Sequence, residues 1–253
     1  MNNEGFHRSR RVFLRMSGVI AVTLLVGGAR TPLALAQAST TNFPLKIGVV
    51  GSGRLGGSVG GRWVKAGHEV FFSSRHPEEL KGLVDSLGPR AHAGSVKDAI
   101  AFATVVFIAV PYAALPEIGR ENAAGLAGKI VIDACNPIAS RDGEIVKEAM
   151  ANGIGQTSMR YLPGTRLVRA FNPVGYRSFE GEAQAAPASE RIGMPIASDD
   201  AGAAKVAAQL VRDVGLEPVE VPLARAMDFA PGTALFGKPI PVAELRKLLG
   251  VAQ

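Results

Sequence analysis

The sequence is poor in the residues that build disulfides, metal sites and nucleophilic catalytic centres. It holds one cysteine, Cys135, and four histidines among 253 residues. A single cysteine excludes an internal disulfide framework, and neither an H-E-x-x-H nor a C-x-x-C spacing occurs. We therefore expect no metal site and no paired nucleophile and base. A lone thiol also suits an oxidising compartment, because it has no wrong partner within the chain.

Aromatic residues are scarce as well, at 6%, and the sequence has no internal repeat, heptad array or low-complexity tract. The 30 glycines and 16 prolines are scattered singly, as turn residues are, so no disordered domain is predicted. With 47% hydrophobic and 20% charged residues, the composition is that of a globular chain with one sizeable core.

The net charge of +6 is concentrated at the N-terminus. The first 38 residues hold five arginines and one acid, which leaves 23 basic and 21 acidic residues for the rest of the chain. A body so close to neutral has no electrostatic footprint for DNA or RNA. We therefore predict no nucleic-acid partner.

The N-terminal residues have the features of an export signal. Residues 9–15, Ser-Arg-Arg-Val-Phe-Leu-Arg, resemble a twin-arginine motif, and an apolar stretch follows at 16–29. Ala34-Leu35-Ala36 and Ala36-Gln37-Ala38 both fit a signal-peptidase site. At 1.5 Å per residue the stretch spans only about two-thirds of a roughly 30 Å hydrocarbon layer, which disfavours a membrane anchor.

We therefore predict a signal peptide over 1–38, cleaved near Ala36 or Ala38, and a periplasmic or secreted protein without a stable membrane anchor. The competing interpretation is a cytoplasmic protein whose true start lies near Phe43. The twin-arginine route carries folded proteins, so a cofactor bound in the cytoplasm can travel with the chain.

A glycine-rich turn follows the first expected strand of the body. Residues 45–50 form an apolar run of strand type and lead into the sequence 51–56, which reads G-x-G-x-x-G. A helix is expected over 55–66 and a second strand over 69–73. This order is the context that supports a dinucleotide-binding fingerprint, whereas the glycines alone would be weak evidence.

Each glycine of this turn has a physical role in such a site. Gly51 makes the tight bend, Gly53 lets backbone N–H groups approach a pyrophosphate, and Gly56 lets the helix pack closely on the strand. The competing interpretation is a glycine-rich turn that binds no ligand.

The end of the second strand indicates which dinucleotide is bound. NAD-selective folds place an acid there to accept a hydrogen bond from the ribose 2′-hydroxyl. This strand ends instead in Ser74 and Arg75, and no acid occurs before Glu78. An arginine can pair with a 2′-phosphate and a serine hydroxyl can donate to it, which favours NADP(H) over NAD(H). Alternatively, Arg75 is an ordinary solvated surface residue.

Strands and helices continue to alternate along the chain, which predicts a doubly wound, mostly parallel α/β sheet of the Rossmann type. Residues 43–180 form its NADP-binding domain, and 181–253 form a small α/β extension that continues the sheet. Further helices are expected at 77–86, 95–102, 112–124 and 241–249, and one that Ser198 can cap. Further strands are expected at 104–110, 129–133, 167–171, 192–197 and 218–221.

In these features the chain resembles the coenzyme F420-dependent NADPH:deazaflavin oxidoreductases and their dinucleotide-binding relatives. The matching segments are 51–56, 73–75, 108–111, 133–137, 162–164, 170–172 and 223–227. The resemblance extends from residue 45 to about 235. The chain departs from that family at Asp228, where a glutamate is expected, and in a short C-terminal segment, so the second substrate stays open.

The resemblance implies the roles of individual residues. The residues implied at the cofactor are Gly51, Ser52, Gly53, Arg54, Leu55 and Gly56 at the phosphates, Ser74 and Arg75 at the 2′-phosphate, and Val110, Pro111 and Asn136 at the nicotinamide. Phe171 and Asn172 are expected beside the cleft for hydride transfer. Tyr112 is the one candidate proton donor, whereas Cys135 is interpreted as a packing residue.

The sequence thus predicts an NADP(H)-dependent oxidoreductase that exchanges hydride with a small planar acceptor, deazaflavin-like or flavin-like. The alternative is a non-catalytic, NADP-binding module of the periplasm. The predicted partner is a small molecule, and a homodimer stays open.

Overall fold

The computed structural model describes residues 44–179 and 187–252. Both ranges lie within one unit of the chain, residues 42–253. The predicted signal peptide and both predicted cleavage sites lie outside the described residues. No helix in the two described ranges has the length and apolar character needed to cross a membrane.

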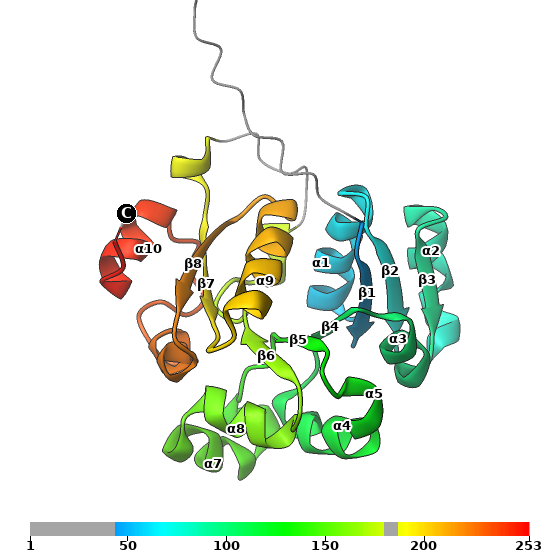
Figure 1. Ribbon diagram of the computed structural model, residues 1–253, viewed down its shortest axis with the longest axis horizontal. Coiled ribbons are helices and arrows are strands. Elements are labelled where there is room, and N and C mark those ends of the chain that lie inside the picture. Colours follow the sequence, from blue (N-terminus) through cyan, green and yellow to red (C-terminus); the bar gives the residue numbers. More distant parts are fainter. Residues whose placement is uncertain (1–43, 180–186, 253) are drawn as a thin grey trace, which may run out of the picture. The chain divides into compact units, whose positions relative to one another are not determined.

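An eight-stranded sheet with the order β3-β2-β1-β4-β5-β6-β7-β8 forms the centre of this unit (Figure 1). Strands β1 to β6 are parallel, β7 joins β6 in the antiparallel sense, and β8 runs parallel to β7. The strands are β1 Lys46–Val50, β2 Glu69–Ser73, β3 Ala91–Gly94, β4 Val105–Ile108, β5 Ile130–Asp133, β6 Arg166–Arg169, β7 Gly193–Ala197 and β8 Glu217–Val221. The predicted mostly parallel sheet, continued by C-terminal strands, is confirmed.

Helices cover both faces of the sheet, and Figure 1 shows α2 at one edge and α10 at the other. The α-helices are α1 Arg54–Lys65, α2 Lys81–Leu87, α3 Val96–Phe102, α4 Leu115–Glu121, α5 Ala123–Leu126, α6 Ala139–Asp142, α7 Ile145–Asn152, α8 Ile154–Tyr161, α9 Ala201–Asp213 and α10 Val242–Leu249. Short 3-10 helices are η1 Pro77–Leu80, η2 Tyr112–Ala114, η3 Tyr176–Phe179, η4 Ala188–Glu190 and η5 Leu223–Phe229.

Strand β4 illustrates why the core has two halves. Successive side chains of a strand point to opposite faces, so a strand covered on both sides must be apolar throughout. Val105 and Phe107 belong to the core cluster that contains residues of α1 and α9. Val106 and Ile108 belong to the cluster that contains residues of α3, α4 and α8. The chain therefore leaves β1 and β4 toward opposite faces.

Side chains fix the starts of two helices. Ser95 and Asp98 form a reciprocal capping box that starts α3. Helix α9 is capped by Asp200, whose carboxylate accepts from the N–H of Ala203 at 2.9 Å. The prediction that Ser198 caps this helix is therefore wrong: among the described residues its hydroxyl accepts only from the N–H of Asp200, at 3.2 Å and before the helix begins, and donates to the carbonyl of Leu167 at 2.7 Å.

Other predicted helices differ in detail. The one expected over 77–86 divides into η1 and α2, and the one over 112–124 divides into η2, α4 and α5. Helix α4 ends where the Asn122 amide donates to the carbonyl of Ile118 at 2.9 Å. Helices α6 to α8 were not predicted. Gly153, with a φ of +84°, separates α7 from α8.

Candidate functional site

A cleft lies at the carboxyl ends of the parallel strands, where β1 and β4 are neighbours but their connections leave toward opposite faces. Ligands of open α/β sheets bind at such a switch point. Two cavities occur there, with volumes of about 340 Å³ and about 230 Å³. Leu55 and Asn136 line both cavities, which are therefore neighbours.

The glycine-rich turn between β1 and α1 borders this cleft. Gly51 has a φ of +93°, and a Cβ there would lie 2.7 Å from the carbonyl oxygen of Ala109. A Cβ on Gly56 would lie 2.1 Å from the carbonyl oxygen of Gly51. A Cβ on Gly53 would meet no atom within 4 Å. The fold thus requires glycine at 51 and 56, whereas Gly53 leaves open space on the outside of the turn.

Ser52, in the same turn, carries a buried polar group. Its hydroxyl is buried and has no hydrogen-bond partner among the described residues. Its N–H donates to the carbonyl of Ser73 at 3.0 Å, which ties the turn to β2. Helix α1 begins two residues later and has no acid in its first turn. A buried hydroxyl normally has a partner, so Ser52 and the helix N-terminus together suit a phosphate oxygen.

Ser74 and Arg75 lie just beyond β2, next to the turn. The Ser74 hydroxyl accepts from the N–H of His76 at 3.1 Å. Arg75 is exposed and makes no hydrogen bond or ion pair within the described residues. The first acid, Glu78, is exposed and lies 3.5 Å from the Nδ1 of His76. Arg75 therefore keeps its guanidinium available to an anion at this end of β2.

Arg54 is shared between α1 and the segment after β6. Its Nη1 lies 3.3 Å from the hydroxyl of Tyr176, and its guanidinium lies 5.4 Å from the centre of that ring. Tyr176 lines the second cavity. No local pattern pointed to this tyrosine, because the contact joins segments 122 residues apart.

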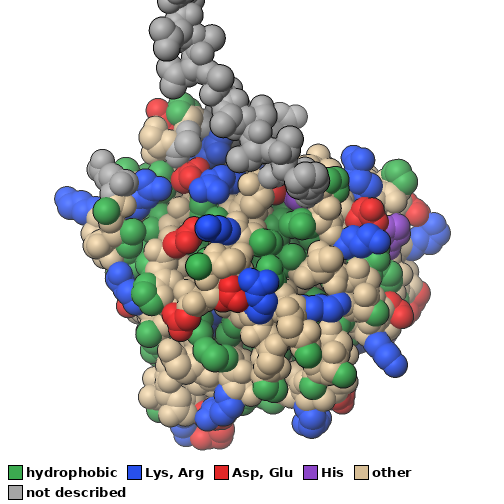
Figure 2. Space-filling model, viewed as in Figure 1, with side chains coloured by type: hydrophobic (Ala, Val, Ile, Leu, Met, Phe, Trp, Pro, Cys, Tyr) green, Lys and Arg blue, Asp and Glu red, His purple; other side chains and the backbone are tan. Residues whose placement is uncertain are grey.

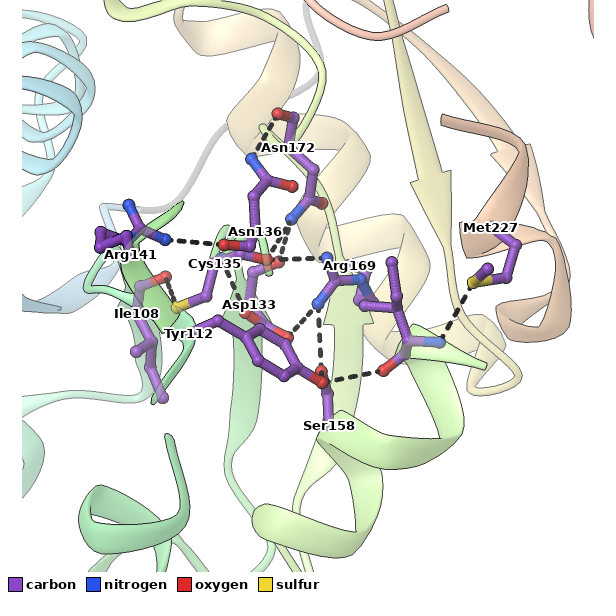
Figure 3. Close-up of polar contacts among 11 residues, drawn as sticks. Ile108, Tyr112, Asp133, Cys135, Asn136, Arg141, Ser158, Arg169, Asn172 and Met227 are labelled. Carbon is purple, nitrogen blue, oxygen red and sulfur yellow. Dashed lines mark hydrogen bonds and ion pairs between the residues drawn. The ribbon is translucent and has the colours of Figure 1, made fainter. Parts of the chain in front are cut away.

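Val110, Pro111 and Asn136 line the first cavity, as the resemblance implied, and Arg141 joins them there. Sequence reasoning missed Arg141. Its Nε and Nη2 donate to the two carboxylate oxygens of Asp142 at 3.1 Å and 2.8 Å, and its Nη2 also donates to the Asn136 carbonyl at 2.7 Å. The guanidinium is thus fixed at the rim of the cleft (Figure 3).

The carboxyl of Asp142 is fully buried. Its burial opposes ionisation, but hydrogen bonds from Arg141 and from the N–H groups of Ile138 and Ala113 outweigh burial and lower its pKa. The ionised carboxylate therefore holds three segments together around the cleft: η2 through Ala113, the segment before α6 through Ile138, and α6 itself through Arg141.

Asn136 and Asn172 each follow a parallel strand and lie side by side in the second cavity. The Asn136 amide donates to the Asn172 carbonyl at 2.8 Å. The Asn172 amide donates to the carbonyls of Asp133 and Cys135, both at 3.2 Å. Their side-chain oxygens are buried and have no partner within the described ranges.

Phe171, expected beside the cleft, borders the second cavity, but its ring is fully buried. The ring packs edge-on against Trp63 and Phe107, with centroid distances of 5.7 Å and 5.4 Å. Phe171 has a φ of +67°, the one positive value at a non-glycine residue in the described ranges. Such strain is tolerated where the surrounding packing enforces it. The backbone at Phe171 thus places the Phe171 ring in the core, and the next residue, Asn172, lies at the cleft.

Tyr112 does not reach the cleft, so its role as candidate proton donor is wrong. The side chain is fully buried, and its hydroxyl lies 3.2 Å from the Oγ of Ser158 on α8 (Figure 3). Burial is the main cause that raises the pKa of this phenol far above its ordinary value. Tyr112 therefore braces the contact between η2 and α8.

A buried ion pair, which the sequence did not predict, lies behind the two asparagines. Arg169 of β6 pairs through Nη1 with the carboxylate of Asp133 in β5. The same Nη1 lies 3.0 Å from the Ser158 hydroxyl, and Nη2 donates to the Cys135 carbonyl at 2.8 Å. Burial raises the pKa of the Cys135 thiol, which donates to the Ile108 carbonyl at 3.5 Å as a packing residue does.

Figure 2 shows basic and acidic side chains interspersed over the face in view, with no basic patch on it. Within residues 44–179 and 187–252, no cluster of three His, Cys, Asp or Glu side chains could hold a metal ion.

Part of the chain matches a known protein family. Residues 46–137 match the family of coenzyme F420-dependent NADP oxidoreductases. The resemblance expected from the sequence is confirmed over this range, which contains the glycine-rich turn, the end of β2 and Asn136.

One curated relative is the metalloreductase STEAP3 of Rattus norvegicus, which is 28% identical over 179 residues, or 70% of this chain. The chain spans about a third of the length of that relative, since the match covers 33% of it.

Solved structures share the fold. A hypothetical protein from Sinorhizobium meliloti is 24% identical, with a TM-score of 0.66 over 78% of this chain and 95% of that one. A protein from Arthrobacter sp. described as an F420-dependent NADP reductase is also 24% identical, with a TM-score of 0.61 over 78% and 99%. An imine reductase from Myxococcus stipitatus in complex with NADP+ is 16% identical, with a TM-score of 0.51 over 81% and 60%. At these identities the likeness establishes the fold alone.

Proposed function

We propose that the protein is an NADP(H)-dependent oxidoreductase that transfers hydride between NADPH and a small planar acceptor, deazaflavin-like or flavin-like. The observation that carries this proposal is the glycine-rich turn beside Ser74 and Arg75. The turn offers an open approach at Gly53 and a Ser52 hydroxyl with no partner among the described residues, and no acid stands at the end of β2. The family match over 46–137 supports the same cofactor.

The residues present fit this dinucleotide along its length. Gly53, Ser52 and the start of α1 would hold the diphosphate, and Ser74 and Arg75 would hold the 2′-phosphate. The nicotinamide half would lie in the first cavity, along Val110, Pro111 and Asn136. NADPH, when bound, supplies a hydride and is left as NADP+.

The protein contributes positioning more than proton transfer. Among the described residues that line the two cavities, Tyr176 and Arg141 are the only titratable ones. Such a cleft suits direct hydride transfer to an acceptor that then takes the one proton it needs from solvent. The family match and the name of one relative, a metalloreductase, support a reductase.

Binding of NADPH and NADH to two arginine variants tests the cofactor. Arg75→Ala is expected to weaken NADPH binding at least about tenfold and to leave NADH binding nearly unchanged, because only NADPH carries the 2′-phosphate. Arg90→Ala is the matched control. Arg90 is also exposed but precedes β3, at the amino ends of the parallel strands, whereas Arg75 follows the carboxyl end of β2. Unchanged NADPH affinity in Arg75→Ala would contradict the assignment.

Stopped-flow oxidation of bound NADPH separates an enzyme from a non-catalytic module. We expect absorbance at 340 nm to fall when a flavin or a deazaflavin is added, and not to fall with the protein omitted. Tight NADPH binding without oxidation by any acceptor of either kind would favour the binding module.

We also propose that the protein is exported through the twin-arginine route, on the basis of residues 9–15 and the two A-x-A sites. Expression in a bacterium is expected to yield a periplasmic protein that begins near Ser39 or Gln37 by N-terminal sequencing. Replacing Arg10 and Arg11 with lysine should keep the uncleaved chain inside the cell. A soluble cytoplasmic protein with an intact Met1 would overturn this proposal.

A further inference from the structure

The side-chain carboxamides of Asn136 and Asn172 lie side by side in the second cavity, and each leaves its oxygen without a partner among the described residues. Asn136 follows β5 and Asn172 follows β6, so the parallel pairing of these strands sets the two side chains side by side. Asn172 is 4% exposed. Neither side-chain oxygen has a partner within the described residues.

The hydrogen-bond network fixes which end of each carboxamide is left over. The amide nitrogen of Asn172 faces the carbonyls of Asp133 and Cys135, so a flipped side chain would set an oxygen against two oxygens. The amide nitrogen of Asn136 likewise faces the carbonyl of Asn172. Both N–H groups of the Asn172 amide and one of the Asn136 amide are therefore used within the protein, and both side-chain oxygens remain for a ligand (Figure 3).

The base of this network is rigid. The Cys135 carbonyl that receives the Asn172 amide also receives Nη2 of Arg169, which the Asp133 carboxylate holds. The carboxamide oxygens thus keep their direction in the absence of a ligand, as preorganised recognition groups do.

From this geometry we infer that Asn172, with Asn136 beside it, selects a hydride acceptor that presents an N–H group. A ring imide or lactam N–H, or a protonated imine, would donate to these oxygens. A carbonyl or carboxylate would set its own lone pairs against them. This inference rests on the proposed function and narrows its second substrate to an N–H donor.

The position of Asn172 favours the second substrate over the cofactor. Asn136 lines both cavities, whereas Asn172 lines only the second, which is the one farther along the sheet from the glycine-rich turn. Tyr176 lines that cavity too and contributes an aromatic side chain beside the place of a planar ring.

Binding of two flavins to the NADP+-loaded protein, followed by flavin fluorescence, tests the inference without turnover. Lumiflavin has a ring N3–H, and 3-methyllumiflavin lacks it. The wild type is expected to bind lumiflavin at least about tenfold more tightly. Asn172→Leu keeps the branched shape of the side chain but removes the carboxamide with its acceptor oxygen, so the preference should fall to near one. Asn122→Leu, the same change at the end of α4, should keep the wild-type preference.

A comparison of NADPH with an analogue tests whether the N–H group that Asn172 binds belongs to the cofactor or to the second substrate. If Asn172→Leu weakens NADPH but not its 3-acetylpyridine analogue, which lacks the carboxamide N–H, the ligand of Asn172 is the cofactor and the inference is overturned. A preference unchanged in Asn172→Leu also overturns it.

A cyclic imine of five ring atoms distinguishes the inference from the proposed function. If the imine is reduced with a dependence on Asn172 while no flavin or deazaflavin is, the N–H inference holds and the planar acceptor of the proposed function fails. If a flavin is reduced equally well by wild type and Asn172→Leu, with or without the N3 methyl group, the proposed function holds and the inference fails.

Discussion

Arg169 and Asp133 form an ion pair across β6 and β5 in which the side chains are 1% and 0% exposed. Each charge depends on the other, because taking a single charge out of water is costly unless it is paired. The same arginine supports the Cys135 carbonyl beneath Asn172. The Arg169–Asp133 pair therefore contributes both to the stability of the fold and to the support of the Cys135 carbonyl beneath Asn172.

Arg169→Met should therefore lower the free energy of unfolding by about 3–5 kcal/mol, the cost of leaving one partner of a buried pair alone. Urea denaturation followed by circular dichroism measures it. Arg166→Met is the matched control in the same strand, since its pair with Asp200 is partly exposed and should matter much less. An equal loss in both variants would contradict a special role for the buried pair.

The glycines of the turn should separate folding from binding. Gly53→Ala is expected to leave the melting temperature nearly unchanged, because its Cβ meets no atom within 4 Å and its φ is −71°. It should nevertheless weaken NADPH binding about tenfold or more, since the methyl group would occupy the approach to the turn.

Gly56→Ala provides the contrast. Its Cβ would lie 2.1 Å from the Gly51 carbonyl oxygen, so the turn itself must shift and the melting temperature should fall. Thermal unfolding measures the effect of each variant on stability, and NADPH titration measures its effect on cofactor binding. Normal NADPH affinity in Gly53→Ala would show that the dinucleotide does not approach there.

Local patterns made the sheet and one half of the site predictable. Apolar runs such as 105–108 and the G-x-G-x-x-G spacing depend on neighbours in sequence, and the structure has strands and a turn there. Val110, Pro111 and Asn136 follow strands, and the carboxyl ends of parallel strands share one edge, so their approach could be expected.

The features of the site that were not predicted depend on contacts between segments that are distant in sequence. Arg169 looked like one more residue of a strand, and only the fold brings it to Asp133, 36 residues earlier. Tyr112 is close in sequence to Pro111 at the cleft, yet α8, which was not predicted, draws its hydroxyl into the core. Helix α8 escaped prediction because its buried residues include Gly155, Thr157 and Ser158, which are poor markers of an apolar face.

The buried position of Tyr112 predicts a structural role. Tyr112→Phe should lower the free energy of unfolding by about 1 kcal/mol, the usual net value of one buried hydrogen bond. Because the hydroxyl does not reach the cleft, kcat/KM for NADPH oxidation should change by less than about twofold. Tyr176→Phe, which alters a hydroxyl at the cleft, is the comparison. A large loss of kcat in Tyr112→Phe alone would restore Tyr112 as a proton donor.

Asp142 should make stability depend on pH in the acid range. Its pKa is lowered in the folded protein, because hydrogen bonds from Arg141 and two backbone N–H groups outweigh the effect of burial. A carboxyl with a lowered folded pKa contributes its full stability above the unfolded value of about 3.9. That contribution is lost as the pH falls through the lower folded pKa.

Asp142→Asn tests this relation. The difference in unfolding free energy between wild type and Asp142→Asn should be constant from about pH 5 to pH 7 and should shrink below about pH 4. Arg141→Met is the second background, because it removes the side-chain donor and leaves burial to oppose ionisation. There the folded pKa should be lowered less, so the loss on acidification, which begins near the same unfolded value, should be smaller and should be complete at a higher pH than in the wild type. If the difference between wild type and Asp142→Asn does not change with pH across the acid range, this carboxylate does not hold the rim of the cleft through its charge.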